Sequence, residues 1–598
     1  MLKGLKFLLK QVWKYKKNYI IYEILLQLSK LMIPISTIIF PKYIIDELMG
    51  KQRLEYVVSF IIGMLSLNFL GVFFTSFFEG KIFVAKGIVF NRFQYDMSEK
   101  LLDCDFENIE NPDFLDVKEQ AGKFLYANGM GFGVVLDSAF NIIGNLFVFV
   151  GIVAVISTLS VWVVLVFVIL VLLSAYVDSK VRKNYTKWDM EKVPIERKTS
   201  YMIDIIEDFS YGKDIRIYRA KNFLLKKISA VLNESNRFYA KQIKVLNKSK
   251  YFNSFITLIR DGISYSYLVY HVLGKMITIG DFSMYVNAVA QFSNAMNELM
   301  RSILDIQQFS GYYEALEKYL NIPATMREGK GMKGLDEDKL YIEFHDVSFR
   351  YPKQENYAVQ HINLKIGTGE KLAVIGENGA GKTTFVKLLM RLYDPTEGYI
   401  SINGVDIKEL DYDYYQSLLA VVFQDYKLFS FSIKENVDFG EESSDETIVE
   451  EITQVGLKSK LDSLPNGIYT NLHKNFEADG FEPSGGEGQK IAIARALHKG
   501  ASIIILDEPT AALDPRAEYN IYQNFNQLVQ GKTALFISHR MSSAQFCDKI
   551  VVFDKGRICE YGTHAELMEK KGLYEELYHM QAQFYVQEEG KENEMVNL

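Results

Sequence analysis

Residues 371–384 read KLAVIGENGAGKTT, and this stretch decides the fold of the second half of the chain. Its first five residues are a short apolar run that predicts a buried strand, and the helical sequence FVKLLMRLY follows it. The loop between them matches the pattern G-x-x-x-x-G-K-T, with the fixed positions at Gly376, Gly381, Lys382 and Thr383. Glycines allow backbone N–H groups to surround phosphate oxygens without a Cβ in the way. The stretch therefore predicts a strand–loop–helix unit that binds a polyphosphate.

The side chains of this loop have separate expected tasks. Lys382 should reach the outer phosphates, and Thr383 should hold Mg²⁺. The N-terminus of the following helix adds partial positive charge toward the same anion. The alternative, a chance glycine-rich loop, does not account for the strand and the helix on either side.

A second predicted strand, Ile503–Asp507 (IIILD), ends in two consecutive acids. Asp507 is placed to bind Mg²⁺ directly or through water, and Glu508 can orient or deprotonate an attacking water. Taken alone, an acid at a strand end is often only a helix cap. Together with a phosphate loop, the pair predicts hydrolysis of a phosphoanhydride.

A third motif, PSGGE at 483–487, precedes the helical run GQKIAIARAL. Ser484 is a good N-cap, and the glycines after it leave backbone donors exposed, which makes another anion site. Taken alone, the motif is equally a simple capped helix.

The first half of the chain contains long apolar stretches. The clearest are Val57–Phe78, Val134–Ile156 and Val161–Val177, and a helix of about 20 such residues crosses about 30 Å of hydrocarbon. Three further stretches carry some polar residues: Tyr19–Leu48, Phe252–Leu273 and Ile279–Met300. These six stretches predict six membrane spans.

Basic residues gather on one side of the predicted spans. Six lysines precede the first span, and a basic group follows the fourth: Lys180, Arg182, Lys183 and Lys187. Basic loops stay in the cytoplasm, so both termini are expected there. The N-terminal segment MLKGLKFLLKQVWKYKK lacks the features of a secretory signal and predicts an amphipathic helix on the cytoplasmic leaflet.

Two connectors are unusually long for a helical bundle. Glu79–Gly133 and Asp178–Ser249 are both rich in charge and helical in pattern. They predict helices that continue below the membrane and turn on short cross-helices, near Asn108–Asp116 and near Ser210–Asp214.

Composition excludes several classes of protein. Of the 598 residues 48% are hydrophobic, so most of the chain is not disordered. The net charge of −7 provides no global positive field for nucleic acid, and no nucleic-acid partner is expected. Three cysteines predict free thiols in a reducing compartment rather than a disulfide framework.

The motifs of the second half, in this order, resemble the nucleotide-binding domain of an ABC transporter. With six spans ahead of it, nearly the whole chain resembles a half-size ABC exporter. The resemblance implies an all-α six-helix transmembrane domain with long cytoplasmic helix extensions, followed by an α/β P-loop ATPase domain. The expected divisions are a transmembrane domain at 1–320, a linker at 321–339, the nucleotide-binding domain at 340–585 and a disordered acidic tail at 586–598.

The same resemblance implies ATP and Mg²⁺ as ligands and assigns roles to single residues. The phosphate loop comprises Gly376, Glu377, Asn378, Gly379, Ala380, Gly381, Lys382, Thr383 and Thr384. The signature loop, which contacts the nucleotide of a second subunit, comprises Ser484, Gly485, Gly486 and Glu487. The metal ligands are Thr383, Gln424 and Asp507, and the catalytic residues are Glu508, His539, Lys382 and Gln424.

Three of these roles are worth stating separately. Tyr351, in FRYP, matches the aromatic residue that stacks on adenine, and its position ahead of the strand favours this role over that of a packed aromatic. Gln424, in VVFQDY, also senses the membrane domain in this family, and His539 lies near the γ-phosphate. Asp514, in AALD, matches the acid that communicates between subunits.

The signature loop departs from the family pattern at both ends. It usually begins with leucine and ends with glutamine, whereas here Pro483 and Glu487 stand at these places. A carboxylate near a triphosphate is unfavourable unless it is compensated. The preceding stretch HKNFEADG lacks the common form of the loop that touches the membrane domain, and Glu477 and Asp479 are equal candidates for that contact.

The expected function is ATP-driven export of an amphipathic peptide, drug or lipid from the cytosol or inner leaflet, by a dimer of two such chains in the plasma membrane. Three alternatives remain open: a heterodimer with one weak ATP site, an importer with exporter architecture, and a regulatory membrane ATPase. Four charged residues lie within or near the spans and would face a cavity, a cargo or a structural partner: Glu23, Lys30, Arg260 and Asp261.

Overall fold

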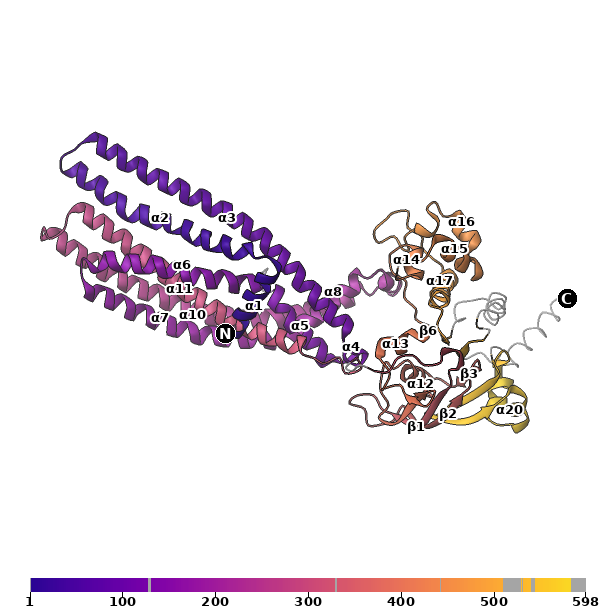
Figure 1. Cartoon of the computed structure of the whole chain (residues 1–598). Helices are drawn as coiled ribbons and strands as arrows, with labels where there is room; N and C mark the ends of the chain where they lie inside the picture. The colour runs from indigo at the N-terminus through magenta and orange to yellow at the C-terminus, as the bar shows by residue number, and fades with distance from the viewer. Residues whose placement is uncertain are drawn as a thin grey trace. The chain divides into compact units, whose positions relative to one another are not determined.

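The computed structural model describes residues 2–126, 131–327, 331–440, 442–508, 529, 531–538 and 544–581. The chain divides into two compact units, which Figure 1 shows as a helical part and a mixed part. Unit 1 is Met1–Cys104 with Asn108–Pro323, and unit 2 is Asp105–Glu107 with Ala324–Leu598.

Unit 1 is a bundle built around six long helices (Figure 1). They are α2 (Asn18–Met49), α3 (Leu54–Asp103), α6 (Gly131–Ser157), α7 (Val161–Glu191), α10 (Lys221–Leu273) and α11 (Ile279–Leu320). Each of the six predicted spans lies inside one of them. The N-terminal segment forms its own helix, α1 (Leu2–Tyr15).

Apolar side chains lie on the outside of this bundle. Phe69 and Phe73 on α3 and Trp162 and Ile169 on α7 are all more than half exposed. Such surface is costly in water and ordinary in lipid. Among the described helices, α2, α3, α6 and α7 are long and apolar enough to cross a membrane by length and composition. Helices α10 and α11 are long enough, but polar and charged residues such as Arg260 make them less apolar.

Helix α2 contains two prolines, Pro34 and Pro41, which remove backbone donors in the middle of a span. Two nearby hydroxyl groups donate hydrogen bonds in this part of the helix. The Thr37 hydroxyl donates to the Ile33 carbonyl at 3.0 Å, and the Ser36 hydroxyl donates to Asn68 Oδ1 on α3 at 2.7 Å. Because lipid offers no hydrogen bonds, such internal contacts are favoured within a span.

The cross-helices lie where the sequence predicted them. The first turn consists of α4 (Phe106–Glu110) and the start of α5 (Pro112–Tyr126), and the second follows α8 (Val193–Glu207) as a 3₁₀ turn and α9 (Gly212–Ile217). The residues Asp105–Glu107 belong to unit 2. There the Asp105 carboxylate accepts the Thr325 N–H at 2.8 Å.

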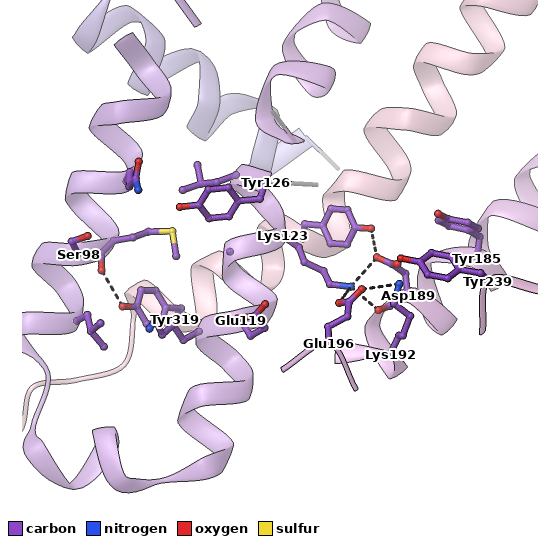
Figure 2. Close-up of a pocket in the computed structure, with 17 residues that line it drawn as sticks. Ser98, Glu119, Lys123, Tyr126, Tyr185, Asp189, Lys192, Glu196, Tyr239 and Tyr319 are labelled. Atoms are coloured by element: carbon purple, nitrogen blue, oxygen red, sulfur yellow. Dashed lines mark hydrogen bonds and ion pairs between the residues drawn. The ribbon is translucent and has the colours of Figure 1, made fainter. Parts of the chain in front are cut away.

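The helical extensions of unit 1 line a cavity of about 590 Å³, and an ion-pair network crosses it (Figure 2). Lys123 Nζ on α5 lies 3.1 Å from Asp189 Oδ2 on α7 and 3.0 Å from Glu196 Oε2 on α8. Lys192 Nζ lies 2.7 Å from Glu196 Oε1, and the Tyr312 hydroxyl on α11 donates to Asp189 at 2.6 Å. These charges are paired with one another, so we interpret the network as a link between four helices.

Replacing Lys123 with methionine should therefore destabilise unit 1. It leaves the partly buried Asp189 and Glu196 carboxylates without their shared partner, at a cost of about 1–2 kcal/mol, between the values for an exposed and a fully buried pair. Thermal unfolding of the full chain in detergent is the measurement, and Lys118→Met, on the same cavity wall, is the control. Equal unfolding midpoints for the two variants would rule out this role for Lys123.

Unit 2 has two sheets. The larger has the order β10-β9-β3-β8-β7-β6 and is parallel except for β10. Its strands are β10 (Arg557–Gly562), β9 (Lys549–Asp554), β3 (Lys371–Gly376), β8 (Thr533–Ile537), β7 (Ile503–Asp507) and β6 (Leu419–Val422). The smaller sheet is antiparallel and contains β2 (Val359–Ile366), β1 (Ile342–Phe349), β4 (Glu397–Ile402) and β5 (Val405–Asp406).

Unit 2 also contains seven described α-helices. They are α12 (Lys382–Leu389), α13 (Tyr412–Ser417), α14 (Ile433–Val437), α15 (Asp445–Gln454), α16 (Lys458–Ser463), α17 (Gly485–His498) and α20 (His564–Lys570). Helix α12 corrects one prediction, because it ends at Leu389 and does not continue through the residues RLY. Arg391 adopts a left-handed backbone with φ of 52° and donates to the Leu410 carbonyl. The chain turns there, which buries Tyr393 in the core.

Candidate nucleotide-binding site

The sheet register of unit 2 brings the predicted motifs to one edge. Val374 of β3 pairs with Ile537 of β8, which in turn pairs with Asp507 of β7. The carboxyl ends of neighbouring parallel strands meet at the same edge, and ligands of such sheets bind there. The phosphate loop after β3, the acids at the end of β7 and Gln424 after β6 therefore converge.

The backbone of the phosphate loop needs its glycines. Gly376, Gly379 and Gly381 have φ of +152°, +81° and +106°, a region that favours glycine. A Cβ on Gly376 would lie 2.4 Å from the Phe553 carbonyl oxygen, and one on Gly381 would lie 2.9 Å from the Ala358 carbonyl oxygen. The loop is therefore a cradle of backbone that side chains would fill, as anion binding requires.

Lys382, the first residue of α12, lies inside this cradle. Its side chain is buried, and Nζ donates to the carbonyl oxygens of Gly376 at 2.7 Å and Glu377 at 2.9 Å. Burial lowers the pKa of Lys382, while the nearby charges of Glu508 and Asp507 act in the opposite direction. The ammonium group is thus held within the loop and next to the two acids.

The two acids at the end of β7 repel each other. Burial, and then the charge of Glu508, raise the pKa of Asp507 to about 6, although Lys382 opposes this shift. Gln424 Nε2 donates to Glu508 Oε2 at 2.7 Å, and Glu508 has a left-handed backbone with φ of 49°. The structure thus brings together Gln424, Asp507 and Glu508, three residues that the sequence selected for metal binding and catalysis.

This arrangement fits Mg²⁺. A hard cation prefers oxygen ligands and relieves repulsion between neighbouring carboxylates. Asp507 and Gln424 supply such oxygens at the strand ends, and the Thr383 side chain is exposed on the first turn of α12. In the part of the chain that the structure describes, no group of three or more His, Cys, Asp or Glu side chains forms an alternative metal site.

Tyr351 is packed as a core aromatic and also borders the phosphate loop. Its ring packs edge-on against Phe349 at 5.0 Å and Tyr393 at 5.4 Å between centroids, as a core aromatic does. Its hydroxyl lies 3.1 Å from Thr384 Oγ1, so it also borders the phosphate loop. A cavity of about 440 Å³, with Tyr351 in its lining, opens beside it.

The signature loop compensates for its unusual residues. Ser484 caps α17, and Glu487 Oε2 accepts from the Ser484 N–H at 2.9 Å and from its hydroxyl at 2.8 Å. Burial acts to raise the pKa of Glu487, but these hydrogen bonds outweigh it and lower the pKa. Lys460 Nζ lies 3.9 Å away. Pro483 precedes the cap, where its missing N–H is not needed.

The two loops belong to different cores of unit 2. Helix α12 contributes Phe385 to the cluster that contains Val374, whereas α17 contributes Ile491 to a cluster with Ile448. Figure 1 shows α17 grouped with α14, α15 and α16, apart from α12. The phosphate and signature loops therefore adjoin the two cores that lie on opposite faces of the larger sheet.

Two predicted site residues, His539 and Asp514, lie outside the described residues, as does the predicted tail at 586–598. The sequence reasoning missed two others. Asp425 adds to the repulsion that raises the pKa of Asp507, and the Tyr426 hydroxyl donates to the Gly485 carbonyl at 2.7 Å. Both follow Gln424 directly in VVFQDY, which was the available signal.

The capping box predicts how Glu487 responds to substitution. Glu487→Ala removes both acceptor contacts to Ser484 and should lower the stability of unit 2 by about 1 kcal/mol. Glu487→Gln keeps one amide oxygen as acceptor and should change stability by less than about 0.5 kcal/mol. Denaturant unfolding of the full chain, followed by hydrogen exchange of α17, distinguishes the two. Equal losses for both variants would show that the carboxylate charge, rather than the cap, matters.

Comparisons with known proteins agree with this geometry. The family model described as ABC transporter matches residues 359–511. The subtilin transport ATP-binding protein SpaT of Bacillus subtilis is 31% identical over 96% of this chain and 95% of its own length. The nisin transport ATP-binding protein NisT of Lactococcus lactis is 27% identical over the same shares. The fold matches a bacterial Atm1-family ABC exporter with ATP bound, with a TM-score of 0.81, 20% identity and coverage of 95% of this chain and 98% of that one.

A more partial relative has a different named activity. An ATP-dependent lipid A-core flippase of Alcanivorax borkumensis is 34% identical over 58% of this chain and 59% of its own length. The match to the Bacillus subtilis protein spans the membrane helices as well as the ATPase motifs. This protein therefore belongs to the ABC transporter family, as a half-size exporter that couples a multi-pass membrane domain to an ATPase domain for ATP and Mg²⁺.

Proposed function

We propose that the protein uses ATP hydrolysis to move an amphipathic cargo from the cytosol or inner leaflet outward across the plasma membrane. Residues 1–320 form the membrane domain, 321–339 the linker and 340–585 the ATPase domain, and both termini are cytoplasmic. The relatives named for subtilin and nisin transport support a peptide cargo, and the flippase supports a lipid. The observation that carries the proposal is the Gln424–Glu508–Asp507 group beside Lys382, in a chain whose other half is a lipid-facing bundle.

Each residue of the site has a step in this scheme. The loop from Gly376 to Thr384 and the Lys382 ammonium bind the phosphates, and Tyr351 stacks on the adenine. Thr383, Gln424 and Asp507 hold Mg²⁺, which neutralises charge on the phosphates when bound. Glu508 positions the attacking water, and His539 contacts the γ-phosphate. Gln424 also senses the membrane domain, and its amide donates a hydrogen bond to Glu508 within the site.

The working unit is a dimer of two chains. ATP is held between the phosphate loop of one chain and the signature loop, Ser484–Glu487, of the other, and Asp514 communicates across the interface. The two loops adjoin different cores of unit 2, which supports binding of one nucleotide between two chains. A homodimer is favoured over a heterodimer with one weak site, since Glu508 is present and Glu487 is compensated by Ser484.

Transport in proteoliposomes tests the proposal. With the ATPase domains facing outward, external ATP should drive a labelled amphipathic peptide or a fluorescent phospholipid into the lumen or inner leaflet, and Glu508→Gln should block this. Hydrolysis without movement of either probe would instead identify a regulatory ATPase. ATP-driven loss of a probe preloaded in the lumen would identify an importer.

A further inference from the structure

Two cavities meet inside the membrane bundle of unit 1. The first, here called the acidic cavity, has about 270 Å³ and lies between α2, α3 and α6. The second, here called the amide cavity, has about 240 Å³ and lies between α2, α6 and α11. Lys30 and Asn141 line both cavities, so the two form one continuous lining.

The acidic cavity has more carboxylates than ammonium groups. Glu23, Glu79 and Asp137 face Lys30 and Lys86. Lys86 Nζ lies 2.5 Å from Asp137 Oδ1, and Lys30 Nζ lies 3.8 Å from Glu79 Oε1. Both lysines therefore form their ion pairs with carboxylates other than Glu23. Glu23 is the carboxylate that remains.

Glu23 is buried, with 1% of its surface exposed, and its Oε1 has no hydrogen-bond partner among the described residues. The buried Tyr19 hydroxyl, one helical turn earlier on α2, interacts with the Glu23 carboxylate but, being neutral, does not compensate its charge. Leaving a buried carboxylate oxygen unpaired is costly unless a partner compensates it. A cationic group that enters the cavity would supply that partner.

The amide cavity has a different chemistry. Five of its lining residues carry amide side chains: Gln27, Asn141, Asn145, Gln291 and Asn294. Each amide donates and accepts hydrogen bonds, so together they match the peptide groups of a backbone whatever its side chains. Gln27 Nε2 donates to Asn141 Oδ1 at 3.1 Å. A Cβ on Gly144 would lie 2.2 Å from Gln27 Oε1, so the glycine makes room for this amide.

We propose that the acidic and amide cavities bind the exported cargo, and that this cargo is a peptide with an ammonium or guanidinium group. Glu23 pairs with the cation, and the amide side chains bind the adjoining backbone. This inference rests on the proposed export function and names its substrate class. A phospholipid headgroup fits less well, because its phosphate would meet an unpaired carboxylate.

Binding to the full chain in lipid nanodiscs tests this inference without ATP. The probes are a fluorescent amphipathic decapeptide with three lysines and the same peptide with each lysine ammonium acetylated. The parent chain should bind the lysine peptide about tenfold more tightly or better, as a charged hydrogen bond to a buried carboxylate predicts. Glu23→Gln should lose this preference, and Glu23→Asp, which keeps the charge, should retain part of it. Glu55→Gln, an exposed position on α3, is the matched control.

Two outcomes would overturn the inference. One is equal affinity of the parent chain for both peptides, and the other is a full preference for the lysine peptide in Glu23→Gln. Phosphatidylglycerol is also added as free lipid without vesicles. If it binds more tightly than the lysine peptide, the inference is overturned and the cargo is an anionic lipid. The Mg²⁺-dependent ATPase activity of the same samples is measured alongside. Its absence would contradict the proposed function, whereas its presence with either of the first two outcomes would contradict the cargo assignment alone.

Discussion

Glu508→Gln is expected to retain ATP and to lose nearly all hydrolysis. The glutamine oxygen can still accept from Gln424 Nε2, which lies 2.7 Å from Glu508 Oε2, so the local geometry should persist. The amide cannot accept a proton from water, and the loss of a general base typically costs about 10²–10⁴-fold in rate. Phosphate release gives the rate, and equilibrium binding of labelled ATP gives the affinity.

The matched control for this variant is Glu409→Gln, the same change at an exposed position of unit 2. It should hydrolyse ATP at the parent rate. If Glu508→Gln also hydrolyses ATP at the parent rate, the catalytic assignment is wrong and another group activates the water. If it fails to bind ATP, the carboxylate has a role in nucleotide binding instead.

Lys382→Ala is expected to lose ATP binding itself. The ammonium group lies within the phosphate loop, 2.7 Å from the Gly376 carbonyl oxygen, where it can turn to a phosphate. Removing one partner of a buried charge pair costs about 2–5 kcal/mol, which is roughly 30-fold or more in affinity. Labelled-ATP binding measures the loss.

The substitution of Lys382 should also change the pKa of Asp507. The ammonium group lowers the pKa of Asp507, which burial and Glu508 raise to about 6, so its removal should raise that pKa further. A protonated Asp507 cannot bind Mg²⁺, and residual activity should need more Mg²⁺ near neutral pH. Lys408→Ala, the same change at an exposed position of unit 2, is the control. Parent-like affinity in Lys382→Ala would contradict the phosphate-loop assignment.

Local patterns were sufficient to predict which of the described candidate site residues lie together. The phosphate loop, the acids after β7 and the cap at Ser484 each depend on spacing within a few residues, and parallel strands then bring their ends together. The six long helices could also be predicted from the sequence, because a membrane-spanning helix requires only sufficient length and apolar residues. The predicted end of α12 was wrong, because nothing in the residues RLY indicates the left-handed backbone at Arg391.

Contacts between distant residues could not be predicted in the same way. The Lys86–Asp137 pair joins residues 51 positions apart, and Lys42 Nζ lies 2.6 Å from Asp281 Oδ1 across an even longer interval. Pairing of this kind depends on how the helices pack. Helix packing pairs Lys86 with Asp137 and leaves Glu23 Oε1 without a hydrogen bond, and the sequence alone does not distinguish these two outcomes. The compensation of Glu487 by Ser484, in contrast, was available as a capping box.

The most direct test asks whether ATP joins the phosphate loop of one chain to the signature loop of another. In a Glu508→Gln chain whose three cysteines are replaced, Asn378→Cys is made in one tagged copy and Glu482→Cys in a second. Both positions are exposed; Asn378 lies in the phosphate loop, and Glu482 lies just before the signature loop. With ATP and Mg²⁺, a short bifunctional maleimide is expected to cross-link the two copies several-fold more than without nucleotide. The same low yield with and without ATP would contradict the account.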